Sequence, residues 1–177
     1  YQACDGRYIL AYESMDDASA ALGNWDPIVE SKNANRAVAN PSVIAYIGTY
    51  NSSAAKISIP ILNKAGLVMI SPANTYAGLT KPGLSAIDEP DVFYPSGQRT
   101  YARVIPTDDV QGKVAAKWAK GLAVSSVYIL DDGQPYGKSV AAAFYAEAKA
   151  LGINTLGQQS VDPKATNFTV LMTKLAA

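Results

Sequence analysis

The sequence has no histidine and only one cysteine, and these two shortages exclude several kinds of chemistry. Without histidine there is no Ser-His catalytic triad, and the commonest general base and metal ligand is missing. A single cysteine, Cys4, cannot form a disulfide within the chain or build a cysteine-based zinc site. Cys4 would also lack the histidine that activates a cysteine nucleophile. We therefore expect a bystander thiol, and neither a metal nor a cofactor.

Net charge and long apolar runs are lacking as well. The 177 residues include 15 Lys or Arg and 15 Asp or Glu, so no basic excess is available to follow a phosphate backbone. We expect no nucleic-acid partner. No apolar run is long enough to span a bilayer, and we recognise no signal peptide, which fits a cytosolic protein or a mature secreted one. Apolar residues make up 49% of the chain, enough to build a core.

The sequence does contain an alternation of short apolar runs with stretches of helical spacing. Asp26, followed by proline, is typical of a helix start. Ser52 or Ser53 would cap a second helix, which Pro60 should kink. The elements predicted for the first half are strands at residues 7–13, 42–48 and 67–71 and helices at residues 26–40 and 52–66.

The same pattern begins again after Arg99. Before it, residues 74–99 are rich in proline and glycine, which predicts a long loop with one helical turn. Apolar strands that alternate with helices are typical of parallel sheets covered by helices on both faces. We predict an α/β fold with two lobes, residues 1–99 and 100–177. The elements predicted for the second half are strands at residues 100–106, 125–132 and 153–162 and helices at residues 107–122, 135–152 and 167–177.

Small polar residues follow two neighbouring strands of the first lobe. Ser52 and Ser53 come after the strand at 42–48, and Ala73 and Thr75 come after the next one. In open parallel sheets, ligands bind beyond the carboxyl ends of the strands, and a helix start there attracts a carboxylate or phosphate. The pattern predicts a pocket for a small polar ligand that bears an anionic group. Ordinary caps and loop residues would give the same pattern, so both interpretations stay open.

In the second half, Tyr136 lies at the start of a helix that also follows a strand. It is placed either to close over a ligand or to pack near the hinge between the lobes. Asp131 and Asp132, at the end of the same strand, suggest a different function, a Mg²⁺-dependent phosphoacceptor or hydrolase domain. Adjacent residues of a strand point to opposite faces, and no glycine-rich phosphate loop accompanies them. An enzyme is therefore the less favoured interpretation.

Several stretches, in order and at similar spacing, resemble the type I periplasmic binding proteins of branched-chain amino-acid ABC transporters. In this chain, the stretch AYIGTYNSSAAKISIPILNKAGLVMISPANTYAGLT resembles the first lobe of that family. Three later stretches resemble the family's crossover and second lobe, namely YARVIPTDDVQGKVAAKWA, VYILDDGQPYGKSVAAAFYAEAKALG and TNFTVLMTKLAA. The resemblance implies two Rossmann-like lobes and a solute-binding protein, not an enzyme, which closes on an amino acid and delivers it to permease subunits.

The resemblance also implies where and how the ligand binds. Ser52 would bind the ligand carboxylate, Ala73 would offer a backbone carbonyl, Thr75 a hydroxyl, and Tyr136 would come from the second lobe. Ser53 and Asn74, in the same loops, complete the expected set of ligand-binding residues. A branched-chain amino acid is the implied ligand, and the implied location is periplasmic or extracellular, with a lipid anchor possible on the precursor. A ligand-sensing domain of a receptor or regulator with the same fold is the alternative.

The chain also departs from the family. It lacks the family's opening strand and helix, and it stops before the part that supplies an acidic residue for the ligand ammonium. We therefore expect a fragment, with incomplete sheets and exposed apolar surface. Such a fragment should self-associate or pair with the rest of its own protein.

Overall fold

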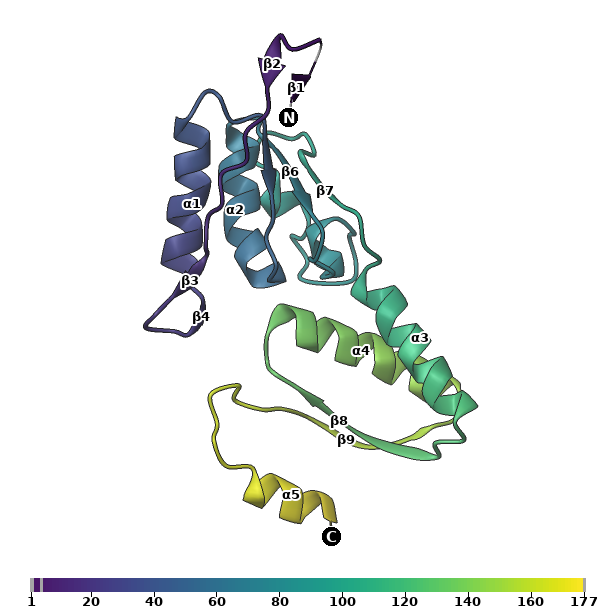
Figure 1. Ribbon diagram of the computed structural model, residues 1–177. Coiled ribbons are helices and arrows are strands. Elements are labelled where there is room, and N and C mark those ends of the chain that lie inside the picture. The colour runs from purple at the N-terminus through teal and green to yellow at the C-terminus, as the bar shows by residue number, and fades with distance from the viewer. Residues whose placement is uncertain (1, 4, 177) are drawn as a thin grey trace.

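The computed structural model describes residues 2–3 and 5–176, and it contains two lobes that each hold a parallel sheet (Figure 1). Cys4 lies outside the described residues. In the first lobe the strand order is β5 (Ala45–Ile47), β6 (Val68–Ser71) and β7 (Tyr101–Arg103), all parallel. Because β7 pairs with β6, the first sheet extends to Arg103, and the chain passes to the second lobe after it. The boundary between residues 99 and 100 that was predicted for the two lobes stays a prediction.

Helices α1 (Pro27–Ala39) and α2 (Ser52–Lys64) pack side by side in the first lobe. The prediction for α1 is confirmed, since the Asp26 side chain accepts a hydrogen bond from the Ile28 N–H at 2.8 Å. The core contains Leu62 of α2 and Met69 of β6, both fully buried. Each such side chain stabilises the fold by about 1.5–3 kcal/mol relative to its exposed state.

The start of α2 differs from the prediction. Asn51, not Ser52 or Ser53, is the N-cap residue, with extended backbone, and its side chain makes no capping hydrogen bond. The Ser52 hydroxyl is engaged elsewhere, because it accepts a hydrogen bond from the Tyr76 N–H at 3.3 Å. The helix runs continuously through Pro60.

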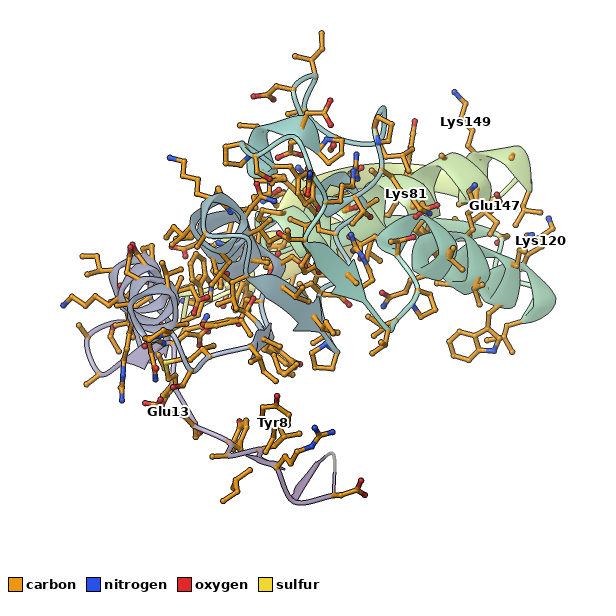
Figure 2. All side chains as sticks on the ribbon, turned by 90° about the horizontal axis from the view of Figure 1, so that it is seen from above. Tyr8, Glu13, Lys81, Lys120, Glu147 and Lys149 are labelled. Atoms are coloured by element: carbon orange, nitrogen blue, oxygen red, sulfur yellow. The ribbon has the colours of Figure 1, made fainter. Side chains whose placement is uncertain are left out.

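The N-terminal segment is another correction. A strand was expected over residues 7–13, but only β2 (Tyr8–Ile9) forms, paired antiparallel with β1 (Gln2–Ala3) and separate from the main sheet. The next residues lie along α1, where Glu13 forms an ion pair with Arg36. Tyr8 stands away from both lobes (Figure 2). A second short hairpin, β3 (Ala18–Ser19) with β4 (Asn24–Trp25), leads into α1.

The long loop after β6 contains two short 3₁₀ turns, η1 (Ala77–Leu79) and η2 (Asp91–Phe93), against the single turn expected. This loop is packed, because Glu89 accepts hydrogen bonds from the Lys56 ammonium and the Tyr76 hydroxyl, both at 2.6 Å. The Arg103 guanidinium donates to the Tyr76 carbonyl at 2.8 Å. The loop is thus fixed to both α2 and β7.

The second lobe follows the predicted order closely. It contains α3 (Asp108–Gly121), β8 (Ser126–Asp131), α4 (Pro135–Ala150), β9 (Asn154–Ser160) and α5 (Thr169–Ala176), with β8 parallel to β9. Helices α3 and α4 approach so closely at Gly112 that an added Cβ would lie 2.6 Å from the Ala143 Cβ. They form one packed unit on one side of β8 and β9 (Figure 1).

The first sheet is covered on one face, whereas both faces were expected to be covered. The paired residues Tyr46, Met69 and Tyr101 form a buried row. On the opposite face, Ile47 of β5 is 60% exposed and Val68 of β6 is 43% exposed. This bare apolar face is the kind of surface expected to associate, and self-association stays a prediction. Within the described residues, no helix has both the length and the apolar content needed to cross a membrane.

Glu30 gives the first lobe a pH-dependent stability. Its side chain is 1% exposed and accepts a hydrogen bond from the Tyr46 hydroxyl at 3.0 Å. Burial raises the pKa of Glu30 from 4.5 to about 7, although hydrogen bonds from Ser58 and Tyr46 oppose the shift. Since the folded-state pKa is the higher one, this stabilisation is complete below pH 4.5 and is lost as the pH rises through about 7.

We therefore predict the effect of Glu30→Gln, which keeps the shape and cannot ionise. Between pH 4.5 and a pH above 7, the unfolding free energy of the wild type should fall by about 3 kcal/mol relative to that of the variant, because only the wild type must ionise a buried carboxyl. Urea denaturation at the two pH values measures it. Glu13→Gln, at an exposed ion pair, is the control. A Glu30→Gln variant with the same pH dependence as wild type would contradict the burial argument.

Candidate functional site

The carboxyl ends of β5, β6 and β7 point toward the second lobe, where α4 begins (Figure 1). The ends of β5 and β6 are joined by Ser71, whose hydroxyl donates to the Thr49 carbonyl at 2.9 Å. The same hydroxyl accepts hydrogen bonds from the N–H groups of Ala73 and Asn74. One buried side chain therefore fixes both strand ends, and with them the loops predicted to bind the ligand.

Asn74 completes this connection. Its amide nitrogen donates to the carbonyls of Thr49 at 2.9 Å and Tyr50 at 3.1 Å, and its oxygen accepts from the Tyr101 hydroxyl at 3.2 Å. The side chain is fully buried and bonded to protein groups on all sides. The geometry gives Asn74 the task of shaping the site, and its predicted contact with the ligand remains untested.

Ser52 and Thr75 lie next to each other at the base of this region. The Ser52 hydroxyl meets the N–H of Tyr76, the residue that follows Thr75. The Thr75 carbonyl accepts a hydrogen bond from the Asp108 N–H at 2.9 Å, which links the loop to the first turn of α3. Ser52 and Thr75 are both buried, and Ala73, two residues before Thr75, is half-buried. The structure thus brings together Ser52, Ala73 and Thr75, three of the five first-lobe residues that were predicted to bind the ligand.

The starts of α2 and α4 meet across the two lobes. The Ser53 hydroxyl, in the first turn of α2, donates to the side-chain oxygen of Gln134 at 3.2 Å. Gln134 is the N-cap residue of α4. Ser53 and Gln134 are 81 positions apart in the sequence, so the fold alone makes this contact.

These two helix starts share an electrostatic property that sets them apart. In the part of the chain that the structure describes, neither α2 nor α4 has a side-chain cap or an acidic residue in its first turn. By contrast, α1 is capped by Asp26 and carries Glu30, and α3 begins with Asp108 and Asp109. A helix start has free N–H groups and a partial positive charge of about half a unit. The start of α2 is therefore suited to an anionic group supplied from outside the chain, whereas at the start of α4 the Asp132 carboxylate already accepts a hydrogen bond from the Gln134 N–H at 3.0 Å.

Tyr136 lies in the first turn of α4, and it is 43% exposed. Its hydroxyl accepts a hydrogen bond from the Gln111 side chain of α3 at 3.1 Å. It also lines a cavity of about 470 Å³ between β8 and α4, together with apolar residues such as Leu130 and Phe144. No residue of the first lobe lines that cavity, so it is distinct from the predicted site between the lobes.

Asp131 and Asp132, the residues of the alternative enzyme interpretation, are engaged in a turn. The Asp131 carboxylate accepts hydrogen bonds from the Ser160 hydroxyl at 2.6 Å and the Gly133 N–H at 2.8 Å. Burial acts to raise the pKa of Asp131, but these hydrogen bonds outweigh it and hold the pKa below its ordinary value. Asp132 accepts from the Gln134 N–H. No cluster of three or more His, Cys, Asp or Glu able to hold a metal occurs among the described residues.

Three residues at the site escaped the sequence-based prediction, namely Gln134, Arg103 and Asp108. The Arg103 guanidinium donates to the Asn74 carbonyl at 3.0 Å and so supports the loop that carries Thr75. A hydrophilic residue at a strand end next to buried neighbours is a weak signal for such a role. Asp108 is buried, although a first-turn acidic residue is ordinarily exposed to solvent.

Known proteins give an independent comparison. Residues 18–177 match the family model described as periplasmic binding protein. The chain is 28% identical over 145 residues to an amino acid binding protein of Pseudomonas aeruginosa, which covers 81% of this chain and 35% of that protein. It is 32% identical over 130 residues to a Leu/Ile/Val-binding protein of Rhizobium johnstonii, which covers 73% of this chain and 32% of that protein.

The fold agrees with these matches. A solved leucine binding protein from Thermotoga maritima superposes with a TM-score of 0.71 at 22% identity, covering 85% of this chain and 39% of that one. The predicted fold class is confirmed. The chain spans about a third of the length of the two curated relatives, 35% and 32%.

The hydrogen bonds of Asn74 give a testable expectation. Replacing Asn74 by alanine leaves the Thr49 and Tyr50 carbonyls and the Tyr101 hydroxyl without this buried partner. The unfolding free energy should fall by about 2–4 kcal/mol. Urea denaturation measures it, with Asn35→Ala on the exposed surface of α1 as the control, where a change within about 0.5 kcal/mol is expected. Equal effects of the two substitutions would show that Asn74 does not hold the strand ends.

Proposed function

Because the chain belongs to the periplasmic binding protein family, we propose that it is the solute-binding component of an ABC importer. A small amino-acid-like ligand binds between the two lobes, and the lobes close around it and present it to the permease subunits. The protein then acts in the periplasm or outside the cell, and a lipid anchor on the precursor would keep it near the membrane. The relatives named for amino acids and for leucine, isoleucine and valine support this ligand class.

The single observation that carries the proposal is the meeting of the two uncapped helix starts at Ser53 and Gln134. One start belongs to each lobe, so a ligand held by both would also hold the lobes together. A carboxylate fits this place, since hydrogen bonds to a charged group contribute about 1.5–3 kcal/mol each. Three or four of them suffice for micromolar affinity after the entropy of binding is subtracted.

The roles of the individual residues follow from their places. Ser52, Ser53 and the first-turn N–H groups of α2 bind the α-carboxylate, and the Thr75 hydroxyl adds a further donor. The Ala73 carbonyl accepts from the α-ammonium, and Tyr136 closes over the ligand from the second lobe. A ligand-sensing domain with the same fold would bind in the same way, and only the partner, permease or effector, separates the two roles.

The proposal predicts which chemical group of the ligand matters. Leucine and leucinol share the ammonium and the side chain, and only leucine has the carboxylate. Isothermal titration of the protein as its gene encodes it should give micromolar binding of leucine and at least about 100-fold weaker binding of leucinol, because two charge-assisted hydrogen bonds are lost. Equal affinity for both compounds would contradict the place assigned to the carboxylate.

The same titration tests the residues. Ser52→Ala and Thr75→Ala should each weaken leucine binding by about tenfold or more, since each removes a hydrogen bond to a charged group. Ser42→Ala, on the exposed loop before β5, is the control and should leave the affinity unchanged. Unchanged leucine affinity in both site variants would contradict the site assignment even if the wild type binds leucine.

A further inference from the structure

The side chain of Gln134 bridges the two lobes. Gln134 is the N-cap residue of α4, which packs tightly against α3 at Gly112 in the second lobe. Its side-chain oxygen accepts a hydrogen bond at 3.2 Å from the hydroxyl of Ser53, which lies in the first turn of α2. Figure 1 shows α2 and α4 close together where the lobes meet. This hydrogen bond therefore joins the first lobe to the second.

The hydrogen bond is not needed to build α4. The Gln134 side chain makes no capping hydrogen bond to the helix that it precedes. The Gln134 N–H donates to the Asp132 carboxylate at 3.0 Å, and the Gln134 carbonyl accepts from the Lys138 N–H at 3.0 Å, but both of these are backbone groups. Within the described residues, the side chain is bonded only through its oxygen, and its two N–H donors are not used.

The Gln134 oxygen lies where the proposed function places the ligand carboxylate. The start of α2 has neither a side-chain cap nor an acidic residue in its first turn, so its free N–H groups attract an acceptor with negative charge. The Ser53 hydroxyl has a single hydrogen, which it can donate either to Gln134 or to a ligand. The contact is exposed to solvent, so a small ligand can reach it.

We propose that the Gln134 side chain is an internal competitor of the ligand carboxylate: it occupies the Ser53 hydroxyl in the ligand-free chain and is displaced when a ligand binds. The inference rests on the proposed function, in which Ser53 binds the α-carboxylate. It makes Gln134 a specificity-determining residue, although Gln134 lies outside the expected set of ligand-binding residues.

The charge of the ligand decides whether it displaces the amide. A hydrogen bond to a carboxylate is about twice as strong as one to a neutral oxygen. A ligand with a carboxylate therefore gains more from Ser53 than the chain loses when Gln134 leaves. A ligand with only a neutral oxygen exchanges one hydrogen bond for an equal one. The competition thus favours amino acids over alcohols or amides of similar shape.

The test is the leucine affinity, by isothermal titration, of the protein as its gene encodes it. Gln134→Ala removes the competitor, so leucine should bind about two- to tenfold more tightly, the range expected for one neutral hydrogen bond lost from the ligand-free state. Gln134→Met keeps the length of the side chain without the amide and should act in the same direction. Gln134→Glu makes the competitor a carboxylate, and leucine should bind about tenfold more weakly than to wild type.

Two further variants show whether the effect is specific. Gln159→Ala, at an exposed glutamine of β9, is the matched control and should leave the leucine affinity unchanged. Ser53→Ala lacks the hydroxyl for which Gln134 and the ligand compete. In that background, Gln134→Ala should no longer increase the affinity, and the double-mutant cycle measures this coupling.

The outcomes are distinguishable. Tighter leucine binding in Gln134→Ala that disappears in the Ser53→Ala background supports the inference. Weaker binding in Gln134→Ala overturns it, because Gln134 would then contact the ligand, and unchanged affinity or an equal gain in both backgrounds overturns it as well. If neither the wild type nor Gln134→Ala binds leucine, it is the proposed function that fails. Circular dichroism without leucine shows whether each variant is folded.

Discussion

The arrangement of this chain depends on how the ends of β5 and β6 are held together. Ser71 and Asn74, both fully buried, donate hydrogen bonds to the carbonyls of Thr49 and Tyr50. Buried polar groups that are fully bonded in this way specify one geometry, because any other leaves them unsatisfied. The start of α2 and the Thr75 loop follow directly from these two strand ends. A few buried hydrogen bonds thus determine where the proposed ligand contacts lie.

Helices α1 to α4 divide into two kinds, and the division bears on how the proposed site is built. Those that begin with acidic or capping side chains, α1 and α3, have their positive ends neutralised by the chain itself. The two that meet across the lobes, α2 and α4, have neither a capping side chain nor an acidic residue in the first turn, although the Asp132 carboxylate accepts a hydrogen bond from the Gln134 N–H just before α4. An uncapped helix start is less stable than a capped one by about 1 kcal/mol. The chain forgoes that stability at the start of α2, where an anionic ligand of the proposed kind would restore it.

The sequence was sufficient to predict most of this fold, because strand and helix periodicity depends on local residue types. It predicted α1, its Asp26 cap and the order of elements in the second lobe. It failed for residues 7–13, where a strand was expected but only Tyr8–Ile9 forms one, outside the main sheet. Sequence periodicity cannot show whether a pairing partner is present.

The site was predictable only in part, for a related reason. Ser52, Ala73 and Thr75 could be predicted, because they directly follow predicted strands and lie within a stretch of sequence that resembles the family. Gln134 and Asp108 could not, because their importance comes from contacts between segments far apart in the chain. In the sequence, Asp108 resembles any acidic residue in the first turn of a helix, and only its complete burial in the structure distinguishes it from such residues.

We propose that one ligand engages the starts of α2 and α4 at the same time. Amide hydrogen exchange with and without leucine tests it most directly, because it reports on individual N–H groups. We expect slower exchange on leucine binding at Ser52–Ala54 in the first lobe and at Tyr136–Lys138 in the second. Leucine binding that protects the amides of only one of these two helix starts, or of neither, would contradict it.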